Sequence, residues 1–114
     1  MVVDTLSDDE VDRLFHALAD ATRRDILRRS VAGEQCVSAL AGHYQMSFAA
    51  VQKHVAVLER ASLVTKHKRG REQIVRAYEP TVQRARHLLE DIEELWRQRA
   101  ARISEVLAQQ KGTS

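Results

Sequence analysis

The stretch that decides the fold runs from residue 47 to residue 80 and reads SFAAVQKHVAVLERASLVTKHKRGREQIVRAYEP. In its first part, apolar side chains recur every three or four residues, which is the spacing of one face of a helix. Ser47 is a favourable N-cap, so a helix is predicted from there to about Ala61. The period then changes. Two β-prone runs flank a polar turn that contains a glycine, which predicts a β-hairpin over residues 63–78.

The predicted helix has two different faces. At 100° per residue, the inward side collects Phe48, Val51, Val55 and Leu58. The opposite side collects Ala49, Gln52, Lys53, Ala56 and Arg60. The small alanines on this outer side would let the backbone come close to another surface. Phe48 is expected in the core, with an apolar contact to a ligand as the alternative.

The tip of the predicted hairpin is strongly basic. It places Lys66, His67, Lys68, Arg69 and Arg71 within six residues, and Gly70 allows a tight turn between the strands. The whole chain has a net charge of +2, but residues 47–76 carry seven bases and two acids, a net charge of +5. Residues 1–20 carry six acids and one base, a net charge of −5. A basic region beside an acidic one suggests a face for a polyanion.

The residues before this stretch predict three shorter helices. Ser7 and Glu10 have the spacing of a capping box in front of a helix over about 8–19. Asp20 can cap a second helix, which Gly33 ends. The run EQCVSALAGHY, residues 34–44, predicts a short third helix. Together with the helix that follows Ser47, it forms a predicted helix-turn-helix over residues 37–61.

The last predicted element is a long helix over residues 80–110, which Pro80 can open. Its apolar stripe consists of Leu88, Ile92, Leu95, Trp96, Ile103, Val106 and Leu107. The remainder of the chain is too small to cover so long a stripe, so part of it is expected to meet a second subunit. The alternative is packing within its own chain. The predicted fold class is mainly α with a small β-hairpin, one winged helix-turn-helix domain over residues 1–114, and dimeric.

Two short helices followed by a basic hairpin are the elements of a winged helix-turn-helix, whose second helix enters the major groove of DNA. Gln52 can bond adenine, and Lys53 can donate to guanine or to a phosphate. The tip cations would neutralise phosphates. Plain solvation of Gln52 and Lys53, and a charged edge that prevents aggregation, are the alternatives. His54 is expected either as a packed, hydrogen-bonded residue or as a phosphate contact.

Composition narrows the remaining possibilities. The absence of a long apolar run predicts that the protein does not enter a membrane, and the acidic N-terminal residues do not look like a secretory signal. Cys36 is the only cysteine, which suits a reducing cytoplasm. The sequence shows no nucleophile–base pair, phosphate loop or metal cluster, so we expect no enzyme and no cofactor.

Three segments together resemble the ArsR/SmtB-type winged-helix repressors of bacteria: FHALADATRRDIL, VSALAGHYQMSFAAVQKHVAVLERASLV and GREQIVRAYEP. The resemblance covers about residues 10–80. It implies a homodimer formed by the first and last helices that binds a palindromic operator in double-stranded DNA, often near its own gene. The implied DNA-binding residues are Ser47, Phe48, Ala49, Gln52, Lys53 and His54, with Lys68, Arg69, Gly70 and Arg71 in the wing. The implied dimerisation residues are Leu14, Leu88, Ile92, Leu95, Trp96 and Ile103.

The chain departs from the family pattern in several places. Phe48-Ala49 stands where Gln-Pro is frequent, Ser often stands where Gln52 does, and Ser62 replaces a usual glycine. One family metal site uses two cysteines one residue apart, but here Cys36 is followed by Ser38. The other uses histidine pairs, whereas His87 stands alone beside Glu90, Asp91 and Glu94. No metal site is therefore expected, and the inducer is unknown. The alternatives are a metal- or redox-responsive family member and a helical protein-interaction adaptor that does not bind DNA.

Overall fold

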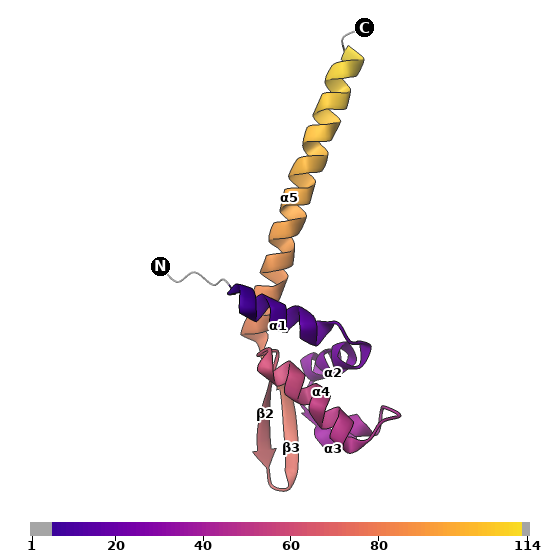
Figure 1. The fold of residues 1–114 in the computed structure, drawn as a ribbon, viewed down its shortest axis with the longest axis vertical. Helices are drawn as coiled ribbons and strands as arrows, with labels where there is room; N and C mark the ends of the chain where they lie inside the picture. The colour runs from indigo at the N-terminus through magenta and orange to yellow at the C-terminus, as the bar shows by residue number, and fades with distance from the viewer. Residues whose placement is uncertain (1–5, 113–114) are drawn as a thin grey trace. The chain divides into compact units, whose positions relative to one another are not determined.

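A computed structural model describes residues 6–112, and for the last two of these only the backbone. Its helices are α1 (Asp8–Leu18), α2 (Ala21–Ala32), α3 (Val37–Ala41), α4 (Phe48–Arg60) and α5 (Glu79–Gly112). Its strands are β1 (Gln35–Cys36), β2 (Val64–Arg69) and β3 (Glu72–Ala77) (Figure 1). The expected fold class is confirmed, with one element added: the two-residue strand β1 precedes α3 where the sequence predicts the start of a helix.

The helix starts follow the predicted capping. Ser7 and Glu10 form both hydrogen bonds of the capping box at the start of α1. The Asp20 side chain accepts the backbone N–H of Arg23 at 3.0 Å and so caps α2. Ser47 does the same for α4, where its Oγ accepts the N–H of Ala50 at 3.1 Å. Each cap satisfies a backbone donor that the first helical turn leaves unpaired.

The three strands form one antiparallel sheet in the order β1-β3-β2. Arg69 pairs with Glu72 at the end of the β2–β3 hairpin, so its loop is only Gly70 and Arg71. Gly70 has a φ of 63°, the positive value that a type II′ turn needs at its first loop position. The strands therefore extend to a two-residue turn, and they place the basic side chains on a regular hairpin.

The core lies between the helices and the sheet, and it is built from side chains of α1, α2, α3, α4 and the strands. Its largest fully buried members are Leu14, Ile26, Val37, Leu40, Val51, Val55, Leu58, Leu63, Val64 and Val75. The predicted inward face of α4 contributes three of them, at the spacing of one helical face. This packing fixes the rotation of α4 and so determines which of its side chains point outward.

The contacts divide the chain into two units, residues up to Arg84 and residues from Ala85 onward, with the boundary inside α5. The first unit contains the core described above. In the second, no side chain between residues 85 and 110 is buried. None of the helices within residues 6–112 combines the length and apolar character needed to cross a lipid bilayer.

Candidate nucleic-acid interface

The outer face of α4 is free to meet a ligand. Ala49, Gln52 and Lys53 are exposed, as the helical spacing predicts, and Ala56 is half-buried. Lys53 forms no ion pair with any residue in the range 6–112. Long side chains flanked by alanines leave this face narrow, which suits entry into a groove.

The expectation that Phe48 belongs to the core is wrong. Its side chain is 47% exposed, although it shares the helical face of the buried Val51 and Val55. Phe48 is the first residue of α4, so it lies at the end of the helix, beyond the part that the other helices cover. An exposed aromatic ring at this end can instead make the alternative contact, which is an apolar contact with the methyl group of a thymine.

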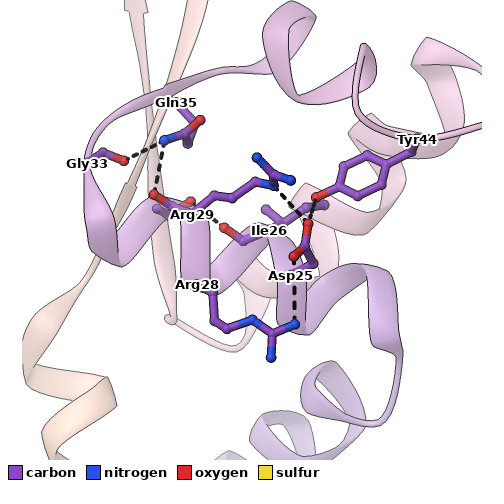
Figure 2. A network of polar contacts seen from close by, with 8 residues as sticks. Asp25, Ile26, Arg28, Arg29, Gly33, Gln35 and Tyr44 are labelled. Atoms are coloured by element: carbon purple, nitrogen blue, oxygen red, sulfur yellow. Dashed lines mark hydrogen bonds and ion pairs between the residues drawn. The ribbon is translucent and has the colours of Figure 1, made fainter.

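The turn that leads into α4 is held against α2 by a polar network (Figure 2). The Tyr44 hydroxyl donates to Asp25 Oδ2 at 2.6 Å, and Arg29 Nε donates to the same oxygen at 2.8 Å. These two hydrogen bonds lower the pKa of Asp25 to about 2, and the bond from Tyr44 has the larger effect. Burial and the bond to Asp25 raise the pKa of Tyr44 to about 12. Both residues therefore keep their bonded forms across the neutral pH range.

His54 is half-buried and hydrogen-bonded within its own chain. Its Nδ1 lies 3.2 Å from Arg23 Nη1. A guanidinium group has donors only, so Nδ1 accepts and the ring proton lies on Nε2. Arg23 also donates to the carbonyl oxygens of Ala17 and His16, at 2.8 and 2.9 Å. Arg23 thus joins the end of α1 to the middle of α4.

The wing cations fall into two groups. Arg69 donates through both Nη atoms to the carboxylate of Glu34, at 3.1 and 3.2 Å, and Arg76 also binds Glu34. Lys66 lies 4.0 Å from Glu59. In contrast, Lys68 and Arg71 are exposed and form no ion pair within residues 6–112. Of the predicted wing contacts, Arg69 is therefore partly neutralised, whereas Lys68 and Arg71 present a full charge.

Comparisons with known proteins identify the family, although no family model matches the sequence. An HTH-type transcriptional regulator of Mycobacterium tuberculosis, Rv2034, is 36% identical over 85 residues, which are 75% of this chain and 77% of the relative. A crystal structure of an ArsR family transcriptional regulator is 30% identical, with a TM-score of 0.75. The alignment covers 82% of this chain and 96% of that one. This chain belongs to the ArsR family of transcriptional regulators.

A third similar protein adds information on assembly. The solution structure of a homodimeric winged helix-turn-helix DNA-binding domain from Mycobacterium bovis is 26% identical to this ArsR-family chain, with a TM-score of 0.61. The similarity covers 79% of this chain and 91% of that domain. The resemblance predicted from the three sequence segments is thus confirmed, and so is the winged helix-turn-helix fold.

The predicted dimerisation residues of this ArsR-family chain differ in their exposure to solvent. Ile92, Leu95, Trp96 and Ile103 are exposed, and Leu88 is half-buried. Leu14 is only 1% exposed, because it packs into the core of its own unit. It therefore offers no surface to a second subunit, and its assignment to the interface is wrong. Its neighbour Phe15 is the exposed large apolar residue of α1.

Cys36 is the last residue of β1 and directly precedes α3. It is half-buried, and its Sγ lies 2.9 Å from the Oγ of Ser38, the main cause of its lowered pKa. Glu90 is engaged by Arg86 at 3.3 Å, and Glu94 by Arg97 at 3.4 Å. Within residues 6–112, no group of three or more His, Cys, Asp or Glu residues is placed to hold a metal ion.

Several residues that shape this surface were missed from the sequence. Tyr44 and Asp25 are 19 positions apart, and Arg69 and Glu34 are 35 apart, so no helical or strand spacing connects them. Glu34 begins the run 34–44, from which the sequence predicts only a short helix, so its position gave no sign of a contact with the wing. The register of the three-stranded sheet, which brings β1 beside β3, is what places Glu34 near the wing.

Proposed function

We propose that this ArsR-family protein is a cytoplasmic, homodimeric repressor that binds a palindromic operator through α4 and the wing. The observation that carries the proposal is the set of exposed, unpaired cations. Lys53 on α4 and Lys68 and Arg71 on the wing form no ion pair within residues 6–112, although several other arginines in the same unit do. Unpaired cations on two neighbouring elements suit the phosphates on either side of a groove.

The division of roles follows from the positions of the side chains. Gln52 and Lys53 stand on the exposed face of α4 and would contact base edges, while Ser47, Phe48 and Ala49 lie at the end that enters the groove first. Lys68 and Arg71 would contact phosphates and add affinity without sequence information. His54 keeps Nε2–H as a donor, so it can bind a phosphate while it remains attached to Arg23.

The exposed stripe of α5 supports the homodimer. Residues 85–110 bury no side chain, yet they carry the large apolar residues Ile92, Leu95 and Trp96 in exposed positions. An exposed apolar stripe of this length is a typical protein–protein contact. Pairing through this stripe would give two copies of α4 related by a twofold axis, and hence two half-sites in the operator. Occupation of an operator near a promoter would block transcription.

Fluorescence anisotropy and footprinting on the DNA upstream of the gene test the proposal. Protection over two half-sites about 10 base pairs apart, or a multiple of that, is expected, together with strong salt dependence. Gln52→Ala should change the preferred sequence, whereas Lys68→Ala should weaken binding to all sequences alike. Binding that does not depend on salt, or no binding, would favour the protein-interaction adaptor.

A further inference from the structure

A polar cavity of about 300 Å³ lies among α1, the end of α4 and the beginning of α5. All of its lining residues belong to the unit that ends at Arg84, so the cavity is formed within one compact body. Its volume is at the lower end of the range for small-molecule sites in proteins. It is separate from the proposed DNA contacts, because none of Gln52, Lys53, Lys68 and Arg71 lines it.

The lining is rich in positive charge. Three arginines line the cavity, Arg13, Arg60 and Arg84, against the single acid Glu10. Glu10 already accepts the backbone N–H of Ser7 at 3.0 Å. This bond and the Ser7 hydroxyl lower its pKa, with smaller contributions from Arg13 and Arg84. Within residues 6–112, neither Arg13 nor Arg60 forms an ion pair. The lining therefore carries more positive than negative charge.

A buried hydroxyl at the wall of the cavity has no partner. Thr81 is 2% exposed, and its Oγ1 makes no hydrogen bond within the described residues. Buried polar atoms in native proteins are almost always hydrogen-bonded, so an exception points to a missing ligand or water. Thr81 stands in the first turn of α5, where backbone N–H groups and the helix dipole favour an anion.

We propose that this cavity binds the phosphate group of a small phosphorylated metabolite. A phosphate monoester carries close to two negative charges and three strong acceptor oxygens, which suit a basic lining with several hydrogen-bond donors. Arginine binds phosphate through two parallel hydrogen bonds, and the Thr81 hydroxyl supplies a further donor. The apolar wall formed by Leu6 and Leu14 leaves room for a small organic part.

The position of the cavity gives the ligand a regulatory role. Arg60 is the last residue of α4, and Ser62 follows directly after its C-cap. Arg13 belongs to α1, and Thr81 to α5. A phosphate held by these residues would join the end of the DNA-facing helix to the two helices that carry exposed apolar surface. This consequence rests on the proposed function, but the binding itself does not.

Calorimetric titration of the DNA-free protein with inorganic phosphate and with glycerol 3-phosphate, at constant ionic strength in chloride, tests the site. Saturable binding is expected. Arg13→Gln and Arg60→Gln should each weaken it about ten-fold or more, because each removes a charged hydrogen-bond donor. Arg28→Gln is the matched control, since Arg28 is exposed and does not line the cavity. It should leave binding unchanged.

The Thr81→Val variant shows whether the Thr81 hydroxyl contacts the ligand or only stabilises the fold. Valine has the shape of threonine without the hydroxyl, and that hydroxyl bonds nothing in the described residues. The variant should therefore melt no lower than the parent, while its phosphate affinity falls about five-fold. No saturable binding, equal binding by the Arg13 and Arg28 variants, or binding of succinate in place of phosphate would overturn the proposal. Since no DNA is present, each result is independent of operator recognition.

Discussion

Apolar side chains form a buried core in residues 6–84, but most are exposed in the part of α5 that follows Arg84. The first region encloses leucines, valines and isoleucines from α1, α2, α3, α4 and the sheet in one core. The second buries none of its side chains between residues 85 and 110, although Leu95 and Trp96 are about two-thirds exposed. The first region can thus be stable through its own contacts. The second would gain stability from the partner surface that the proposed homodimer supplies, because an isolated helix in water is only marginally stable.

The two regions also differ in their charges. In the first, most buried or half-buried charges are matched, as Asp25 is by Arg29 and Tyr44. In the second, the ion pairs join neighbours along one exposed helix, such as Arg97 with Glu93 at 2.6 Å, and such pairs contribute little stability. The exposed cations of the first region that form no ion pair within residues 6–112, among them Lys53, Lys68 and Arg71, are therefore the groups to test as ligand contacts.

The largest expected effect comes from a charge on the α5 stripe. Leu95→Glu should convert the dimer to a monomer and weaken operator binding about 100-fold or more, because a twofold interface receives the substitution twice. Sedimentation and anisotropy measure the two effects. Val31→Glu makes a similar change at an exposed apolar residue of α2 and should leave both unchanged. A Leu95→Glu protein that stays dimeric would contradict the prediction, since the stripe of α5 would then not form the dimer interface.

Within the first region, the bond from Tyr44 to Asp25 should be the most sensitive polar contact. Tyr44→Phe should lower the free energy of unfolding by about 1–2 kcal/mol, because it removes a hydrogen bond to a charged group and keeps the ring. Urea titration in phosphate-free buffer measures the change. Tyr78→Phe is a matched control, since that hydroxyl bonds nothing in the described residues. Equal effects of the two changes would show that the network does not anchor the turn.

The same contact predicts a pH dependence. The pKa of Asp25 is lowered from 3.8 to about 2, so its contribution is complete above pH 4 and is lost as the pH falls towards 2. The pKa of Tyr44 is raised from 10 to about 12, so its contribution is lost as the pH rises from 10 towards 12. Tyr44→Phe should therefore flatten the pH dependence of unfolding at both extremes. A parallel curve for the variant would contradict this assignment.

The sequence predicted most of the fold because the decisive signals are local. Capping by Ser7, Asp20 and Ser47 involves residues three positions apart, and the burial of Val51 and Val55 follows from helical spacing. The strand β1 was missed, because two residues cannot show a period and their partners Ile74 and Val75 are nearly 40 positions away. Phe48 was misplaced because spacing describes the side of a helix and not how far along it the core extends.

The candidate site was predicted less completely, for a related reason. Spacing correctly placed Gln52 and Lys53 on the exposed face of α4. It could not show that Glu34 engages Arg69 or that Arg23 binds His54, since both contacts join distant parts of the chain. The cavity beside Thr81 was also invisible, because its lining comes from three helices. Side-chain pairing across elements therefore decides which cations remain available.

The wing offers a direct test of paired against unpaired cations. Lys68→Ala and Arg71→Ala should each weaken DNA binding several-fold, by about 1 kcal/mol, and flatten the salt slope by about one unit. Arg69→Ala should cost less, because Glu34 already neutralises Arg69. Glu34→Gln should release that arginine, tighten binding and steepen the salt slope. Anisotropy over a range of salt concentrations measures all four variants, and an Arg69→Ala effect as large as that of Arg71→Ala would contradict the distinction.

The smallest expected effect concerns the end of α4. The N–H of Ser62 bonds the carbonyl of Glu59 at 2.9 Å, and the N–H of Leu63 bonds that of Leu58 at 3.0 Å, which is the Schellman arrangement. Ser62 has a φ of 60°, the left-handed conformation that glycine adopts without strain. Ser62→Gly should therefore raise the free energy of unfolding by about 0.5 kcal/mol, since relief of about 1–2 kcal/mol of strain exceeds the entropy lost by glycine. Ser62→Ala keeps the strain and should give no gain. A glycine variant that is less stable would show that the strain at Ser62 is smaller than the entropy lost by glycine.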